Sequence, residues 1–154
     1  MNTVVTRQVL AAALIAAGVA FAPTAALAQS APKQAAAQKA EKYKVVIQVS
    51  DNDPAKWNLA LNNARNVQAD LGKDNVDVEI VAYGPGLPML KADSKVTGRL
   101  ADALDHGIGL MACENTMRNT KVEKADIYGG VSFVDAGVVH IMKLQHAGWS
   151  YVRP

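Results

Sequence analysis

The sequence predicts an α/β protein in which a mostly parallel sheet is covered by helices on both faces. Short apolar runs rich in β-branched residues alternate with segments of helical periodicity along residues 43–154. The connections between successive runs are too long for hairpins, so crossover helices are expected between neighbouring strands. A segment of this size is typical of one domain with its own hydrophobic core.

The first strand is predicted at 44–49, KVVIQV, because a continuous β-branched run is typical of a strand buried on both faces. In the segment that follows, Asp53 is placed to cap a helix and Pro54 to open it. Gly72 is expected to end this helix. The apolar residues of the helix recur on one stripe: Trp57, Ala60, Leu61, Ala64, Val67 and Leu71.

The second strand is predicted at 76–83, VDVEIVAY. Residues 84–90, GPGLPML, are expected to form a loop because prolines and glycines dominate the segment. Ser94 is expected to cap the next helix, and His106 with Gly107 to close it. One face of this helix is apolar: Val96, Leu100, Ala103 and Leu104.

The third strand is predicted at 108–112, IGLMA, and CENTMRN after it starts a turn or short helix. A fourth strand is predicted at 131–136, VSFVDA, followed by a helix over 137–146. WSYV at 149–152 predicts a short last strand.

Residues 1–28 have the pattern of a secretory signal: a basic tip, a short apolar core and a small-residue cleavage site. Cleavage is expected after Ala28, which predicts a periplasmic protein. Residues 29–42 carry no large apolar side chain and are expected to form a flexible or weakly helical tether. The predicted organisation is therefore a signal peptide (1–28), a tether (29–42) and one domain (43–154).

The charge balance gives no electrostatic reason for binding to nucleic acid or to a membrane surface. The chain has 16 basic residues, and loss of Arg7 with the signal leaves 15 against 14 acidic residues. Nucleic-acid and anionic-membrane partners require clustered Lys and Arg. Neither partner is therefore predicted for the mature chain.

Four predicted segments lie at the carboxyl ends of strands, where ligands and reactive groups gather in parallel sheets. They are residues 50–53, 84–90, 113–117 and 135–137. The third segment contains Cys113, the only cysteine of the chain.

Cys113 has two interpretations. A thiol at the start of a helix has a lowered pKa, because the backbone N–H groups there stabilise the thiolate. Glu114 places a negative charge beside the thiol, and Arg118, one helical turn further on, is expected to neutralise it. Alternatively, Cys113 is buried and packs as a small apolar residue. Residue spacing alone does not decide between a reactive and a packed thiol.

Other chemistries have less support. The histidines, His106, His140 and His146, lack the spacing that places two imidazoles on one helical face, so neither a metal nor another cofactor is predicted. The G-x-G of residues 84–86 lacks a third glycine and is interrupted by proline, which makes it a poor phosphate cradle. A Cys-His hydrolase pairing of Cys113 with His140 is a weak third hypothesis.

The helix predicted at 137–146 is apolar over more than half of its circumference, through Val138, Val139, Ile141, Met142 and Leu144. One face is expected to pack on the sheet. The remaining apolar surface predicts a contact between subunits.

Four segments together resemble the DsrE/DsrF-like family, specifically its small exported members: YKVVIQVSDNDPAKWNLALNNARN, VEIVAYGPGLPML, GIGLMACENTM and VSFVDAGVVHIMKLQHAGWSYVRP. The resemblance covers nearly all of 43–154. It implies a three-layer α/β/α fold with a five-stranded parallel sheet, assembly as a trimer or hexamer, and a cysteine that carries sulfur as a persulfide. The position that matches the family's reactive cysteine is Cys113.

The leading hypothesis is a periplasmic sulfur carrier or sulfurtransferase that uses Cys113, exchanges sulfur with a donor or acceptor protein and forms a homo-oligomer. The hypothesis expects an ionised thiol that is open to solvent. The residues expected to form the supporting pocket are Asp51, Gly84, Gly86, Glu114, Asn115, Thr116, Arg118 and His140. The alternative is a non-catalytic binding or assembly module in which Cys113 is structural.

Overall fold

One parallel sheet of five strands, in the order β4-β3-β2-β1-β5, organises the domain. The computed structural model describes residues 41–154. The expected signal sequence (1–28) and most of the expected tether (29–42) lie outside the described residues. The strands are β1 (Tyr43–Val49), β2 (Val76–Ala82), β3 (Gly109–Cys113), β4 (Ser132–Val134) and β5 (Ser150–Val152).

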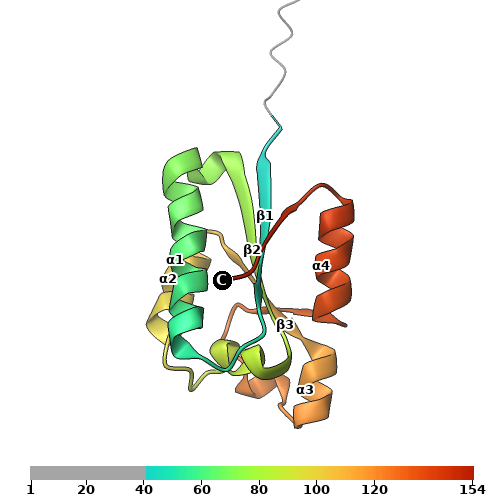
Figure 1. Cartoon of the computed structure of the whole chain (residues 1–154). Helices are drawn as coiled ribbons and strands as arrows, with labels where there is room; N and C mark the ends of the chain where they lie inside the picture. Colours follow the sequence, from blue (N-terminus) through green and yellow to red (C-terminus); the bar gives the residue numbers. More distant parts are fainter. Residues whose placement is uncertain (1–40) are drawn as a thin grey trace, which may run out of the picture. The chain divides into compact units, whose positions relative to one another are not determined.

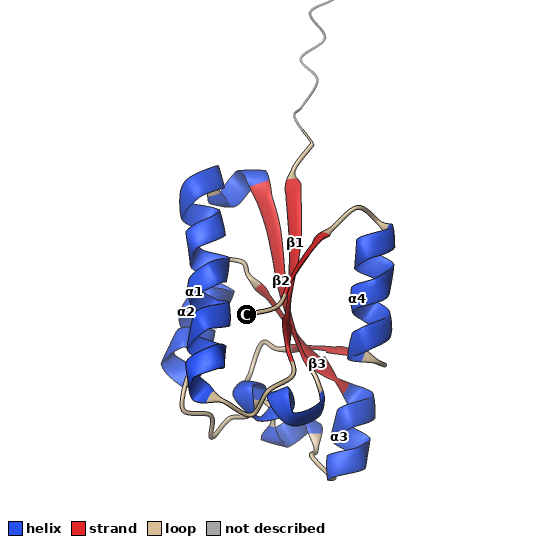
Figure 2. Cartoon of the chain, viewed as in Figure 1, coloured by secondary structure: helices blue, strands red, loops and turns tan. Residues whose placement is uncertain are grey.

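Helices cover both faces of this sheet, as the sequence predicted. Figure 1 shows α1 and α2 on one face, α4 on the other, and α3 near the end where β3 finishes. The helices are α1 (Pro54–Leu71), α2 (Thr97–Asp105), α3 (Glu114–Thr120) and α4 (Gly137–His146). Three short 3₁₀ helices connect other elements: η1 (Lys73–Asn75), η2 (Gly84–Leu90) and η3 (Lys124–Asp126). The α/β class with a five-stranded parallel sheet is confirmed (Figure 2).

The main core lies between the sheet and the helices α1 and α2. Alternate residues of β1 and β2 enter it, among them Ile47 and Ile80, which are fully buried. From α1, Trp57 and Leu61 pack on these strands, on the stripe that the sequence predicted. Asp53 caps α1, because its Oδ1 accepts a hydrogen bond from the Ala55 amide at 2.8 Å.

The opposite face of the sheet, covered by α4, has a smaller apolar core. Val46, Val81 and Ile141 form it, and partly buried residues such as Met111 and Tyr83 pack against it. Gln48, on the same face as Val46, is half-buried and polar. This face therefore combines apolar packing with polar groups, and the strand at 44–49 is less uniformly apolar on this side than the sequence suggested.

Two local expectations were wrong. The segment Gly84–Leu90 is a 3₁₀ helix and not an irregular loop, because proline's fixed φ suits this conformation as well as a turn. Helix α2 begins at Thr97, and its N-cap is Val96 without a side-chain cap. The Ser94 hydroxyl, three residues before Thr97, only accepts a 3.4 Å contact from the Val96 amide.

Candidate functional site

Cys113 is the last residue of β3 and the residue immediately before α3. Strand alternation places its side chain on the α4 face, the face to which Met111 also points. The residue is only 4% exposed. The expectation of a thiol open to solvent was therefore wrong for the single chain, because the segment that leads into α4 passes over the sulfur.

The sulfur is surrounded by hydrogen-bond donors. The Gly137 amide, at the start of α4, donates to Cys113 Sγ at 3.2 Å. Burial raises the pKa of Cys113, but hydrogen bonding from the Thr116 hydroxyl and from backbone amides of Gly137, Thr116 and Asn115 outweighs this, so the pKa lies below the ordinary value of 9.0. The Asn115 amide itself donates to the Asp135 carbonyl at 3.0 Å, so we assign its effect on the sulfur to its dipole. The hydrogen bonds thus stabilise the thiolate by more than burial destabilises it.

Thr116 connects the thiol to η2. Its hydroxyl Oγ1 accepts a hydrogen bond from the Gly84 amide at 2.8 Å, which leaves the hydroxyl proton available for the sulfur. Thr116 is buried at 8% exposure, so its hydroxyl is largely shielded from bulk water. Gly84, Asn115 and Thr116 are the predicted pocket residues that the fold brings to Cys113.

Tyr83 and Gly137 also lie at the thiol, although neither was among the predicted pocket residues. Tyr83 follows β2 directly, and a Cβ added to Gly137 would lie 3.0 Å from Tyr83 Cβ and 3.1 Å from Cδ1. The Tyr83 side chain is therefore packed against the same backbone segment that donates to the sulfur. Burial raises the pKa of Tyr83, and the nearby Tyr151 and Cys113 raise it further. The available sequence signal was that Tyr83 is the last residue of the strand predicted at 76–83, which places it at the carboxyl edge of the sheet.

Glu114 is neutralised by a different residue from the one predicted. Its Oε1 lies 2.7 Å from Lys124 Nζ, and this contact is the main cause of the lowered pKa of Glu114. Arg118 has only a secondary, longer-range effect on that carboxyl group, and its Nη2 contacts Asn115 Oδ1 at 3.5 Å. The negative charge beside the thiol is nevertheless compensated.

Asp51 and Gly86 lie at the same edge of the sheet but serve other contacts. The Asp51 carboxylate pairs with Lys56 at 3.1 Å and with Arg153 at 3.4 Å, and the Lys56 contact is the main cause of its lowered pKa. At Gly86 a Cβ would lie 2.3 Å from the Val49 carbonyl oxygen, so only glycine allows this approach of η2 to β1. These two residues hold the edge together and have no contact with the sulfur among the described hydrogen bonds.

His140 does not pair with Cys113. Its Nε2 lies 2.7 Å from Glu79 Oε2, beneath α4 and part-way along β2. Within residues 41–154 no hydrogen bond joins the imidazole to the thiol, so the arrangement that a Cys-His hydrolase requires is not formed.

A cavity of about 390 Å³ lies beside the thiol, separated from it by Thr116. Its walls are apolar on the η2 side, through Pro85, Leu87 and Pro88, and polar on the α3 side, through Thr116 and Thr120. The 84–90 segment thus borders a pocket, as the sequence suggested, although Cys113 is not part of the lining.

No group of three side chains suited to holding a metal ion occurs within residues 41–154. In the same part of the chain, every helix is too short or too polar to cross a membrane.

The fold and the site define a class of protein: α/β proteins with a thiolate-favouring cysteine at the carboxyl edge of a five-stranded parallel sheet. The structure is similar to MTH1491 of Methanobacterium thermoautotrophicum, a protein of unknown function, with 36% identity and a TM-score of 0.70 over 73% of this chain and 100% of that chain. The chain belongs to the same family as MTH1491, within the DsrE/YchN-like fold family.

Two other solved structures share the fold at lower identity. BT1422 of Bacteroides thetaiotaomicron, a conserved protein of unknown function, has 16% identity and a TM-score of 0.59, covering 72% of this chain and 94% of that chain. The YchN protein of E. coli has 10% identity and a TM-score of 0.59, covering 74% of this chain and 99% of that chain. No family model and no curated protein matches the chain.

Proposed function

We propose that the protein is an exported sulfur carrier or sulfurtransferase that holds sulfane sulfur on Cys113 as a persulfide. The observation that supports this most directly is the surroundings of the sulfur: the Gly137 amide at 3.2 Å and the Thr116 hydroxyl both favour its anionic form. A thiolate is the nucleophile in sulfur chemistry, and a persulfide anion needs the same kind of donors. The DsrE/DsrF resemblance supports the same role.

The chemical step requires no oxidant. The Cys113 thiolate attacks the outer sulfur of a donor persulfide, R–S–SH. The new S–S bond forms as the donor's S–S bond breaks, and the electron pair leaves on the donor as R–S⁻. The products are the Cys113 persulfide and the donor thiolate, so atoms and charge balance. Transfer to an acceptor thiolate is the same exchange in reverse.

Burial of the sulfur also protects a carrier thiol from oxidation. Exposed thiolates are oxidised stepwise in an oxidising compartment such as the periplasm, and the higher oxidation states are irreversible. Cys113 is 4% exposed as a residue, so its sulfur, which accepts a hydrogen bond from the Gly137 amide, reacts only when a donor gains access to it.

Intact-mass measurement after treatment with a persulfide donor tests the carrier function. We expect the wild-type chain to gain the mass of one sulfur atom and Cys113→Ser to gain none. A reducing agent should remove the added mass. No gain in the wild type, or an equal gain in Cys113→Ser, contradicts the proposal.

A non-catalytic assembly module is the second candidate. It is favoured by three exposed apolar residues on α4: Val138 at 52%, Val139 at 43% and Met142 at 63% exposure. In this role Cys113 only packs. Alkylation separates the two functions, because a structural thiol reacts only after denaturation, whereas a carrier thiol reacts in the folded chain.

Export and assembly complete the proposal. The secretory pattern of residues 1–28 supports a periplasmic location, and amino-terminal sequencing of the mature protein should begin at Gln29. The exposed apolar face of α4 supports a homo-oligomer, a trimer or hexamer by family resemblance, with a sulfur donor or acceptor protein as a further partner.

A further inference from the structure

Tyr83 and Cys113 are neighbours on one face of the sheet. The strands β2 and β3 pair in parallel register, with Val81 opposite Met111 and Ala82 opposite Ala112. The next positions along this register are Tyr83 and Cys113. Because alternate residues point to the same face, the Tyr83 side chain emerges beside the thiol, on the α4 side.

Gly137 contacts the side chains of both Cys113 and Tyr83. Its amide donates to Cys113 Sγ at 3.2 Å, and its Cα carries no side chain where a Cβ would lie 3.0 Å from Tyr83 Cβ. The Tyr83 ring therefore packs directly on the backbone that covers the sulfur. Cys113 is buried at 4% exposure, whereas Tyr83 is half-buried, so the ring has one side toward the thiol site and another toward solvent.

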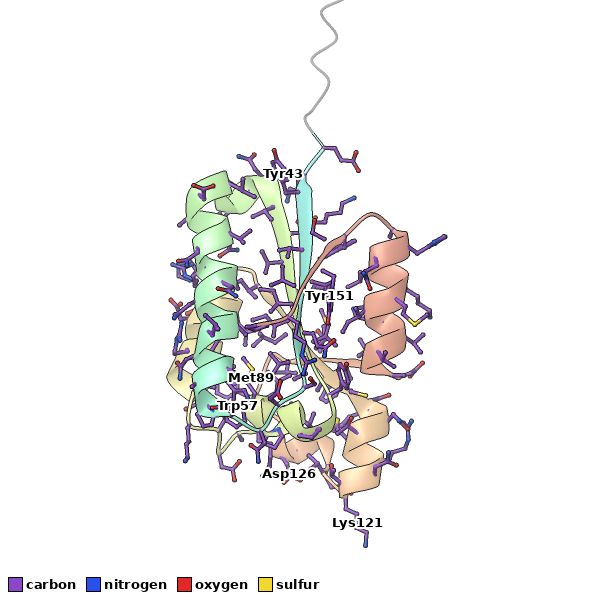
Figure 3. All side chains as sticks on the ribbon, in the orientation of Figure 1. Tyr43, Trp57, Met89, Lys121, Asp126 and Tyr151 are labelled. Atoms are coloured by element: carbon purple, nitrogen blue, oxygen red, sulfur yellow. The ribbon has the colours of Figure 1, made fainter. Side chains whose placement is uncertain are left out.

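The outer part of the ring lies among polar groups and not in a dry core. The Gln48 side chain interacts with Tyr83 and accepts a 2.7 Å hydrogen bond from the Tyr151 hydroxyl. Figure 3 shows Tyr151 between the sheet and α4. The inner part of the ring packs against the small apolar core of Val46, Val81 and Ile141, which holds the ring beside the thiol.

We propose that Tyr83 is the gate of Cys113: its ring closes the thiolate to bulky reagents and admits unbranched chains of sulfane sulfur, such as inorganic polysulfide. This inference rests on the proposed carrier function and assigns its substrate class. Tyr83 acts as a specificity-determining residue, because it sets the width of the approach to the sulfur and takes no part in bond making.

The assigned reaction balances with polysulfide as the donor. The Cys113 thiolate attacks a terminal sulfur of S₄²⁻, the terminal S–S bond breaks, and its electron pair leaves on S₃²⁻. The products are the Cys113 persulfide anion and trisulfide, with the total charge unchanged. A linear chain of single sulfur atoms is narrower than a persulfide attached to a ring or to a branched carbon chain.

Alkylation with reagents of different size tests the gate. Iodoacetamide is small, and a fluorescein-bearing maleimide is bulky. The ratio of their rate constants at Cys113 is measured in the native wild type and in the urea-denatured chain. We expect native protein to favour the small reagent by about tenfold or more relative to the denatured chain. Equal ratios in the two states overturn the gate without any variant.

Variants then assign the effect to Tyr83. In Tyr83→Ala the preference for the small reagent should fall by about tenfold, whereas Tyr83→Phe keeps the ring and should retain the wild-type ratio. Tyr43→Ala is the matched control, because Tyr43 is exposed and lies at the opposite end of the sheet (Figure 3). If Tyr83→Ala does not fold, Tyr83→Leu replaces it, with the same expectation. An unchanged ratio in the folded variant overturns the proposal.

Sulfur loading with sodium tetrasulfide separates this inference from the carrier function. A wild-type chain that gains no sulfur overturns the carrier function and the assigned substrate, whereas the alkylation ratio still reports on the gate. A wild type that gains sulfur, combined with a size ratio independent of Tyr83, keeps the carrier function and overturns the gate.

Discussion

The Gly84 amide and the Thr116 hydroxyl are joined by a 2.8 Å hydrogen bond between η2 and α3, and the same hydroxyl stabilises the Cys113 thiolate. The Thr116 side chain therefore both links η2 to α3 and stabilises the thiolate form of Cys113.

Thr116→Val should destabilise the fold and raise the pKa of Cys113. The variant leaves the Gly84 amide without this acceptor in a partly buried site, which costs at most about 1–3 kcal/mol. Urea unfolding measures the loss of stability, and the pH dependence of alkylation measures the pKa. Thr116→Ser should restore both, because it keeps the hydroxyl. Thr120→Val removes a hydroxyl that bonds only to the α3 backbone, so an equal rise of the pKa in that control contradicts the assignment.

The stability of the protein should rise with pH through the ionisation of Cys113. Because the folded state lowers the pKa of the thiol, the folded chain releases its proton at a pH where the unfolded chain still holds it. The stabilisation is complete above the ordinary value of 9.0 and is lost as the pH falls through the folded-state pKa. The difference in unfolding free energy between wild type and Cys113→Ser should therefore grow toward pH 9. A difference that is constant with pH disproves the lowered pKa.

Gly137→Ala should destabilise the protein by overpacking. The new Cβ would lie 3.0 Å from Tyr83 Cβ, and inserting a methyl group into a packed site costs about 1–3 kcal/mol. Gly129→Ala is the matched control, because a Cβ there meets no atom within 4 Å. Thermal or urea unfolding measures the stability of the two variants. Equal stability of both would show that the space between Tyr83 and Gly137 accommodates a methyl group.

The apolar surface of α4 should mediate self-association. Val138→Glu combined with Met142→Glu places two charges on residues that are 52% and 63% exposed, so the fold should survive while an oligomer dissociates. Sedimentation velocity measures the change in mass. Leu59→Glu, at 45% exposure on α1, is the control that should leave the oligomer intact. An oligomer that persists in the double variant locates the interface elsewhere.

Most of the fold was predictable because its determinants are local. The β-branched runs and the Asp53-Pro54 start of α1 act within a few residues, and each produced the expected element. Helix α2 was harder, since its first turn has no side-chain cap. The conformation of residues 84–90 was missed because proline and glycine indicate a chain reversal without specifying its hydrogen bonds.

The site was only partly predictable, because its contacts join distant segments. Residues following the strands identified the correct edge and placed Gly84 and Thr116 near Cys113. The salt bridge between Glu114 and Lys124 depends on how the chain returns after α3, which no helical spacing encodes. The burial of the thiol and the role of Gly137 likewise depend on the path of the chain from β4 into α4.

The strand order also constrains how the polypeptide reaches its native state. β5 pairs with β1, for example Ser150 beside Val45, so the first strand of the domain can complete its pairing only when the last strand is in place. Such distant pairing slows folding, because a long segment must be ordered before the contact forms. In a shortened chain that lacks β5, one edge of β1 would have unpaired backbone N–H and C=O groups. A strand from another molecule or from a protease could then pair with this edge. Residues 150–152, only three in number, therefore protect the β1 edge and complete the sheet.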